Sequence, residues 1–210
     1  MERPHIPRAL PRAILSGPEM EAVLSQPDIK TKTGQRDRAL LELLYSTGMR
    51  RMEAARLKVY EVDLHQGTVF IHEGKGRRDR VIPLGERAGL WMDRYLREAR
   101  PSFLCAGGPP EAFLNQDGKA LDPDYMGHLV KGYVDKAGIG KKGSCHMFRH
   151  TCATLMLEGG ADVRFVQALL GHSDLSTTEI YTHVSIVKLK EVHARSHPAE
   201  VKAKEETSSP

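Results

Sequence analysis

Six residues of the chain form an ordered set whose side-chain types are those needed to bind and cleave a phosphodiester. Guanidinium groups offer planar forks of donors that match phosphate oxygens, ammonium and imidazole groups transfer protons, and a tyrosine oxygen can attack phosphorus. Each type alone is more often structural or exposed, so only the ordered set is informative. In chain order the set is Arg50, Lys75, His146, Arg149, His172 and Tyr181.

The segment 146–150, with the sequence HMFRH, places an arginine between two histidines. On a helix His146, Arg149 and His150 would share a face, because residues three and four positions apart are neighbours. Such a face suits an anion, although an ordinary solvated polar face is the alternative for the pentapeptide alone. The histidine spacing also occurs in metal sites, but a zincin-type site needs a glutamate where Met147 stands. We therefore expect no metal here.

Glycines accompany the other two cationic residues. Arg50 follows Gly48, and a glycine that interrupts a helix lets backbone and arginine approach a ligand closely. Arg51 stands beside Arg50, and Glu53 could hold one of the two guanidinium groups in place. Lys75 lies between two glycines at a predicted hairpin tip, where a flexible ammonium could protonate a departing alkoxide. The alternatives are a surface Arg–Glu pair and a basic turn that makes only non-specific phosphate contacts.

The last two members of the set follow a predicted helix end. Gly171 is suited to end a helix, which would leave His172 in the loop beyond it. A lone histidine in such a place is usually structural or exposed. A lone tyrosine such as Tyr181 is usually a core residue whose hydroxyl finds a partner.

The elements expected to position these residues are mostly helices. Ser16 and Glu19 form a capping-box pattern, and Asp122 precedes a proline suited to a first helical turn. Three short segments rich in β-formers and separated by glycine turns predict antiparallel strands over 62–64, 68–72 and 80–84. The sequence therefore predicts an α+β fold, mostly helical with a small three-stranded antiparallel sheet. Periodicity and caps predict helices over 16–25, 35–47, 53–58, 85–100, 122–137, 146–158, 162–170, 176–181 and 184–193.

Composition bounds the class of protein. The chain has 210 residues, 40% of them hydrophobic, and a net charge of +4, which allows a polyanionic partner without demonstrating one. No apolar run is long enough for a transmembrane helix, and the N-terminus lacks an apolar signal-peptide core. Three cysteines without metal-type spacing favour a reduced compartment. We expect a cytoplasmic protein that does not associate with membranes.

The ordered motifs resemble the catalytic domain of the tyrosine recombinases, the phage-integrase and Xer-like family. With the flanking helices, the resemblance covers nearly the whole chain. We accordingly expect a linker or arm over 1–13, the catalytic domain over 14–197 and a disordered tail over 198–210. Met52 departs from the family, which often has serine there. The similar segments are Thr47-Gly48-Met49-Arg50 with Glu53, Gly74-Lys75-Gly76 before Val81-Ile82-Pro83-Leu84, the segment 146–150, Leu170-Gly171-His172, and Tyr181.

The resemblance implies a site-specific recombinase or integrase. Tyr181 would attack a DNA phosphodiester, form a 3′-phosphotyrosyl link and release a 5′-hydroxyl. Arg50 and Arg149 would clamp the non-bridging oxygens. No metal or cofactor would be needed, because the arginines supply the positive charge. The remaining implied roles are Lys75 as general acid, His146 as base or phosphate donor, His172 as phosphate hydrogen-bond donor, and Glu53 and His150 as residues that orient the site.

The family also implies double-stranded DNA as partner and a homo-oligomer, a tetramer, on DNA. A monomer in isolation and a requirement for a partner recombinase are left open. Family members usually carry an N-terminal helical DNA-clamping domain, and this sequence begins where their catalytic domain begins, so we expect weak, salt-dependent DNA binding. The alternatives are a catalytically idle DNA-binding or regulatory domain of the same fold and a type IB topoisomerase. An apolar stripe after Tyr181 could dock on a neighbouring protomer or on its own domain.

Overall fold

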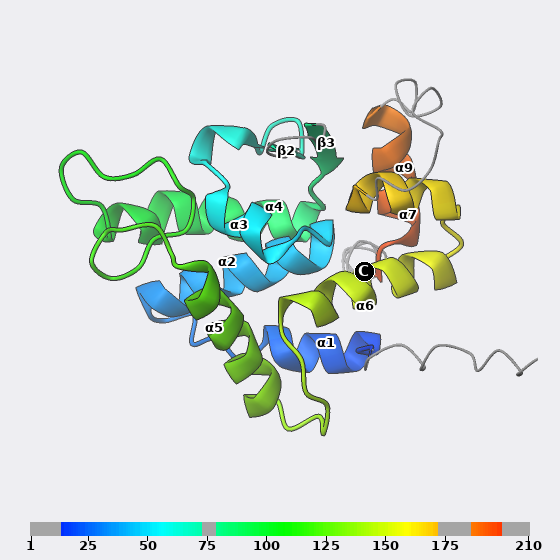
Figure 1. Cartoon of the computed structure of the whole chain (residues 1–210), viewed down its shortest axis with the longest axis horizontal. Helices are drawn as coiled ribbons and strands as arrows, with labels where there is room; N and C mark the ends of the chain where they lie inside the picture. Colours follow the sequence, from blue (N-terminus) through cyan, green and yellow to red (C-terminus); the bar gives the residue numbers. More distant parts are fainter. Residues whose placement is uncertain (1–13, 73–78, 172–185, 199–210) are drawn as a thin grey trace, which may run out of the picture.

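The computed structural model describes residues 14–72, 79–171 and 186–198 (Figure 1). Lys75, His172 and Tyr181 lie outside these ranges. So do the predicted helix over 176–181, the predicted arm over 1–13 and residues 199–210 of the predicted tail. The mostly helical architecture with one small sheet, predicted from the sequence, is confirmed.

Helix α2 (Lys32–Thr47) is the central element of the fold. It packs against α1 (Gly17–Leu24), α4 (Glu86–Arg94) and α6 (Cys145–Glu158), and nearly all of its side chains from residue 34 onward are buried. It begins three residues before the predicted start at residue 35, because the Thr31 hydroxyl accepts a hydrogen bond from the Gly34 backbone and caps the helix. It ends at Gly48, whose φ of 59° lies in the left-handed region.

The predicted helix caps are confirmed at two other starts. Ser16 and Glu19 form the reciprocal capping box of α1, and Asp122 accepts two backbone N–H groups at the start of α5 (Pro123–Lys136). The single helix predicted over 85–100 is wrong in its second half, because α4 ends at Arg94 and is followed by a π-helical turn, η2 (Tyr95–Ala99). The buried Tyr95 hydroxyl donates to the Ala112 carbonyl at 3.0 Å, so a tertiary contact accompanies the change of helix type.

The sheet has three antiparallel strands in the order β1 (Val62–Asp63), β2 (Thr68–Ile71) and β3 (Arg80–Pro83). Each strand is one residue shorter at its end than predicted. Ile82 is buried opposite Val69, and Arg80 pairs with Ile71 at the start of β3. Helix α3 (Arg51–Arg56) lies before the sheet in the chain. It starts and ends two residues before the predicted segment 53–58, because Arg50 already stands as its N-cap and Leu57 is extended.

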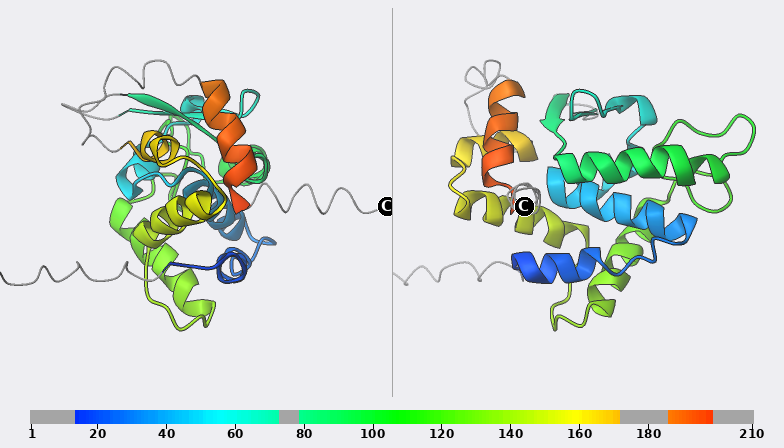
Figure 2. Two further views of the ribbon diagram at one scale, coloured as in Figure 1. Left: turned by 90° about the vertical axis from the view of Figure 1, so that its right-hand side faces the viewer. Right: turned by 180° about the vertical axis from the view of Figure 1, so that it is seen from behind.

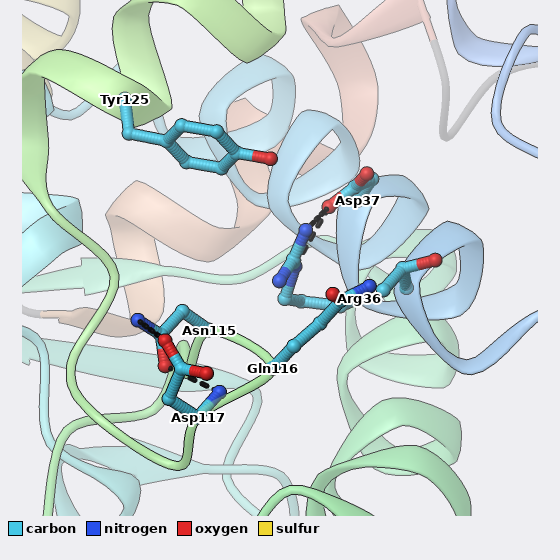
Figure 3. A pocket seen from close by; sticks show the side chains of 7 residues that line it. Arg36, Asp37, Asn115, Gln116, Asp117 and Tyr125 are labelled. Carbon is cyan, nitrogen blue, oxygen red and sulfur yellow. Dashed lines mark hydrogen bonds and ion pairs between the residues drawn. The ribbon is translucent and has the colours of Figure 1, made fainter.

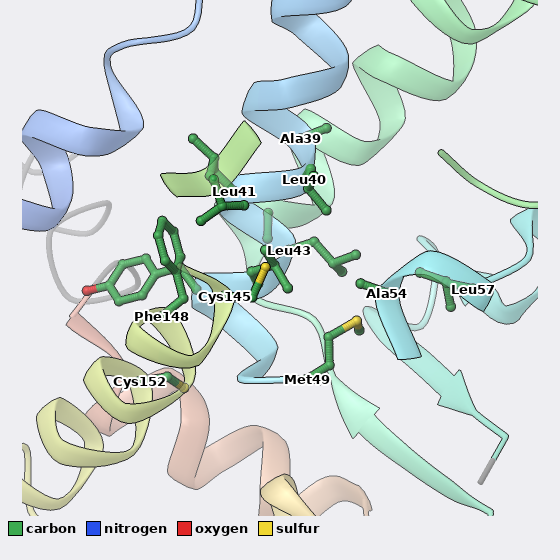
Figure 4. Close-up of a cluster of buried hydrophobic side chains, with 14 of the residues drawn as sticks. Ala39, Leu40, Leu41, Leu43, Met49, Ala54, Leu57, Cys145, Phe148 and Cys152 are labelled. Atoms are coloured by element: carbon green, nitrogen blue, oxygen red, sulfur yellow. The ribbon is translucent and has the colours of Figure 1, made fainter. Parts of the chain in front are cut away.

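The hydrophobic core surrounds α2. Leu41 and Leu43 of α2 lie among Phe148 and Cys152 of α6, and Met49 extends the same cluster toward α3 (Figure 4). All five side chains are almost completely buried. The core thus holds the end of α2, the start of α3 and the middle of α6 in fixed relation to one another.

Helices α7 (Val163–Leu170) and α9 (Ile186–Ser196) complete the described fold. Helix α9 packs against β3, α6 and α7 of its own chain (Figures 1 and 2). Packing on its own domain, one of the two alternatives for the segment after Tyr181, is therefore the arrangement in this structure. In residues 14–72, 79–171 and 186–198, no helix combines the length and apolar character that crossing a membrane requires.

Candidate active site

Three arginines from three different elements converge on the C-terminus of α7. They are the N-cap residue of α3, the first residue of β3 and a residue in the middle of α6. The last carbonyls of a helix lack intrahelical partners and carry the negative end of its dipole, so they attract cationic donors. The three hydrogen bonds run from Arg80 Nε to Leu169 O (3.4 Å), from Arg149 Nη2 to Leu170 O (2.8 Å) and from Arg50 Nη2 to Gly171 O (3.0 Å).

Glu53 supplies negative charge to this group. Its Oε1 accepts from Arg50 Nη1 at 2.9 Å and from Arg80 Nη1 at 3.2 Å. Its Oε2 accepts from the Arg50 backbone N–H at 2.8 Å and from Arg80 Nη2 at 3.0 Å. Burial alone would raise the pKa of the Glu53 carboxyl, but the hydrogen bonds and charge of Arg80, with the hydrogen bonds of Arg50, hold that pKa below its usual range. Glu53 is therefore a carboxylate shared by two arginines.

Arg149 is more deeply buried than Arg50 and His146, the other predicted phosphate ligands that the structure describes. Its residue exposure is 9%, and Nη1 donates to the Gly48 carbonyl at 2.8 Å. The interpretation of the segment 146–150 as an ordinary solvated face is therefore wrong for Arg149. Burial, with the nearby charge of Arg50, lowers the pKa of Arg149 to about 10, so the guanidinium is still charged at pH 7. An anion at this place would offset the repulsion from Arg50 and give the buried guanidinium a charged hydrogen-bond acceptor.

Two glycines allow the elements of the site to approach one another. A Cβ on Gly48 would lie 2.7 Å from Leu170 Cδ2, and a Cβ on Gly171 would lie 2.9 Å from Arg80 Cζ. Both glycines have positive φ, of 59° and 64°, which other residues rarely adopt. The predicted helix break at Gly48 and the predicted helix end at Gly171 are thus confirmed.

The described part of the site is a cationic cluster, which we define as Arg50, Glu53, Arg80 and Arg149. Three positive charges and one negative charge leave it with a net charge of +2. The structure thus brings together three of the residues predicted from the sequence, namely Arg50, Glu53 and Arg149. His146 and His150 are exposed on α6, one turn before Arg149 and directly after it. Such a cluster is suited to hold a phosphate-sized anion.

The three predicted residues outside the described ranges belong to segments joined to this cluster. Lys75 precedes Arg80 by five positions, and His172 directly follows Gly171 in the same stretch of chain as Tyr181. Among the residues that the structure describes, no group of three or more His, Cys, Asp or Glu side chains is placed to hold a metal ion.

Arg80 was not predicted as a site residue. It belongs to a basic stretch that resembles a solvated turn, and its partner Glu53 is 27 positions away. A signal was nevertheless present, because alternation along β3 places Arg80 on the same face as the buried Ile82, with the exposed Val81 on the other. An arginine on the inward face of a strand requires an internal partner.

A polar pocket of about 330 Å³ lies at the other end of α2 (Figure 3). Its lining includes Arg36 and Asp37 of α2, Asn115 and Asp117 of the loop before α5, and Tyr125 of α5. Arg36 and Asp37 form a buried ion pair at 2.7 Å, which gives them a structural role. At 1.5 Å per residue, the pocket lies about 18 Å from Gly48 along the helix, so it is separate from the cationic cluster.

Comparison with known proteins identifies the family of the chain. The Phage integrase family matches residues 14–186. The chain therefore belongs to this family of tyrosine recombinases.

The relatives in sequence carry recombinase names. Tyrosine recombinase XerC 2 of Ralstonia nicotianae is 54% identical over 200 residues, which cover 95% of this chain and 57% of that protein. Tyrosine recombinase XerD of Pseudomonas putida is 42% identical over 198 residues, covering 94% of this chain and 66% of that protein. The chain thus spans 57% and 66% of the lengths of these two relatives.

Solved structures agree with the sequence relatives. The crystal structure of XerA recombinase is similar with a TM-score of 0.71 and 31% identity, covering 93% of this chain and 67% of that one. XerH site-specific recombinase bound to difH substrate, in a pre-cleavage complex, is similar with a TM-score of 0.65 and 33% identity. That match covers 81% of this chain and 50% of the XerH chain.

Proposed function

We propose that this chain is the catalytic domain of a site-specific recombinase that cleaves and rejoins DNA through a phosphotyrosyl intermediate at Tyr181. One observation carries the proposal: Arg50 and Arg149 donate to neighbouring carbonyls, those of Gly171 and Leu170, directly before the stretch that contains His172 and Tyr181. Two guanidinium groups fixed beside the start of a tyrosine-bearing segment are suited to clamp a phosphate that the tyrosine attacks.

In the proposed reaction the Tyr181 oxygen bonds to phosphorus, and the bond from phosphorus to the 5′ oxygen breaks. The tyrosine proton passes to a base, for which His146 is our candidate, and the departing 5′ oxygen receives a proton from Lys75. Since one phosphodiester replaces another, the step is a transesterification and reverses when a 5′-hydroxyl attacks the phosphotyrosine. Arg149 and Arg50 stabilise the negative charge that builds up on the non-bridging oxygens.

The other predicted residues have supporting roles in this proposal. His172 would donate a hydrogen bond to the phosphate, Glu53 would hold the Arg50 guanidinium, and His150 would orient the site. An ordinary tyrosine has a pKa near 10, so the cationic cluster must favour loss of the Tyr181 proton as the attack proceeds. In this proposal the positive charge of the cluster favours loss of the Tyr181 proton, either before the attack or during it.

Double-stranded DNA is the proposed substrate, and the similarity to XerH recombinase bound to its difH substrate supports this class of partner. We further propose a tetramer on DNA, because strand exchange requires four cleaved strands. Assembly of the DNA complex from this chain alone tests whether a second recombinase must contribute subunits. The free cysteines, Cys105, Cys145 and Cys152, are compatible with the reducing cytoplasm that we propose as its location.

A covalent-trapping experiment tests the proposal. The protein is incubated with nicked suicide duplexes of randomised sequence, and DNA-linked protein is detected after denaturation. Wild type should form the adduct with or without EDTA, and Tyr181→Phe should form none, while the exposed-tyrosine control Tyr60→Phe should behave as wild type. Absence of any wild-type adduct contradicts the proposal. Relaxation of a supercoiled plasmid without paired sites would instead identify a topoisomerase.

A further inference from the structure

We infer that Arg80 is a positioning residue for strand cleavage, which holds Glu53 and the end of α7 so that Arg50 can present its guanidinium to the phosphate. This inference rests on the proposed function of Arg50. Arg80 is not expected to touch the DNA, since its side chain is 12% exposed whereas that of Arg50 is 27% exposed. Glu53 lies between Arg80 and Arg50 and accepts hydrogen bonds from both.

Arg80 and Arg50 share the Glu53 carboxylate unequally. Arg80 meets both carboxylate oxygens with its two terminal nitrogens, at 3.2 and 3.0 Å, in the bidentate arrangement typical of strong Arg–carboxylate pairs. Arg50 reaches the same carboxylate with only one guanidinium nitrogen, Nη1, and with its backbone N–H. Arg80 thus takes up accepting capacity that Glu53 would otherwise offer to Arg50.

Arg80 also contacts the end of α7. The Arg80 guanidinium lies against Gly171, because its Cζ, Nε and Nη1 atoms are 2.9 to 3.0 Å from the position that a Cβ on Gly171 would occupy. Its Nε also donates to the Leu169 carbonyl at 3.4 Å. The Gly171 carbonyl, which Arg50 binds, is therefore held from the side by Arg80. Gly171 directly precedes the tyrosine-bearing stretch in the sequence.

Removal of Arg80 should change the chemistry of Arg50 rather than only the stability of the fold. Without Arg80, the Glu53 carboxylate would pair fully with Arg50 and compete with the DNA phosphate for its donors. A lysine at position 80 would restore charge but not the bidentate fork or the contact with Leu169. The maximal rate of adduct formation should therefore fall, with little change in the DNA concentration that gives half-maximal rate.

The test uses Arg80→Met, Arg80→Lys, Glu53→Gln and the double variant in the trapping experiment, under conditions where each is folded by circular dichroism. Loss of one charged hydrogen-bonding partner predicts an adduct rate lower by about tenfold to a hundredfold in Arg80→Met, with partial recovery in Arg80→Lys. The double variant should lose less than the sum of the two single losses, since part of the effect of Arg80 is transmitted through Glu53. The matched control is Arg87→Met, which breaks a similar half-buried pairing with Glu42 and Glu21 away from the site and should keep the wild-type rate.

A second measurement does not depend on activity. In a carbon-detected NMR titration, Arg80→Met should raise the pKa of Glu53, because the carboxylate loses two hydrogen bonds and a neighbouring positive charge, and Arg87→Met should leave it unchanged. An unchanged Glu53 pKa, a wild-type rate in Arg80→Met, or strictly additive rate losses would each overturn the inference. A wild type without any adduct would instead contradict the proposed function, and the titration would still decide whether Arg80 controls Glu53.

Discussion

Two buried histidines of the C-terminal region should make the stability of the protein depend on pH in a narrow range. His193 Nε2 lies 2.7 Å from the Ser46 carbonyl, and His197 Nε2 lies 3.0 Å from the Tyr45 carbonyl, at the end of α2. Because a carbonyl can only accept, each imidazole must carry its proton on Nε2. The two rings stack at 4.7 Å, so protonation of both would place two charges side by side in the interior.

Both histidines have a lowered pKa, and this lowering sets the direction in which stability changes with pH. Burial lowers the pKa of His193 below 6.5, and burial with the neighbouring His193 and Arg87 lowers that of His197 well below 6.5. The unfolded chain therefore binds more protons than the folded protein once the pH falls below about 6.5, and stability is lost as the pH falls. The slope has an upper limit of about 2.7 kcal/mol per pH unit, which applies where both histidines are charged in the unfolded chain and neutral in the folded protein. Against a typical total stability of about 5–15 kcal/mol, even part of this slope is measurable.

Urea unfolding followed by circular dichroism at pH 8, 7, 6 and 5.5 measures this slope. The double variant His193→Gln/His197→Gln keeps an N–H donor at each position but cannot titrate, so its stability should change little over the same range. His65→Gln, at an exposed histidine, is the matched control and should retain the wild-type slope. Carboxylates with lowered pKa, such as Glu19 and Glu53, contribute only at lower pH. Equal losses of stability in wild type and the double variant between pH 6.5 and 5.5 would refute the reasoning.

Other predictions concern the caps and the cluster. Gly48→Ala should lower stability by more than about 1 kcal/mol, because its φ is positive and its Cβ would lie 2.7 Å from Leu170 Cδ2; an unchanged melting temperature would contradict this. Asp122→Ala should cost about 1 kcal/mol in urea unfolding, since two N–H groups at the start of α5 lose their acceptor. Arg149→Lys should slow adduct formation by about a hundredfold or more, and a wild-type rate would remove Arg149 from the proposed clamp.

Local signals in the sequence were sufficient to predict much of the fold. The Ser16 and Asp122 caps, the helix ends at Gly48 and Gly171, and the three antiparallel strands depend on residues close together in the chain, and the structure confirms them. The π-helical turn at Tyr95 could not be predicted in this way. The Tyr95 hydroxyl donates a hydrogen bond to the Ala112 carbonyl, 17 positions away, and such a tertiary contact leaves no periodic pattern in the sequence.

The site was predictable to a similar extent. The sequence predicted that Glu53 could hold one of the neighbouring guanidinium groups, and the structure shows that Glu53 pairs with Arg50 at 2.9 Å. The placement of Arg149 against Leu170 and Gly48, and the sharing of Glu53 with Arg80, depend on how α6, α7 and β3 pack together. A sequence pattern reports which side chains are present, whereas burial and long-range packing decide which of them meet.

The proposal that Tyr181 is the nucleophile is tested most directly by locating the residue that becomes linked to DNA. Trypsin cleavage after Arg164 and Lys188 gives a peptide over 165–188 in which Tyr181 is the sole tyrosine. After trapping on suicide DNA and nuclease digestion, mass spectrometry should find the residual 3′-nucleotide on this peptide, with fragmentation placing it on Tyr181. A nucleotide on any other residue would contradict the account.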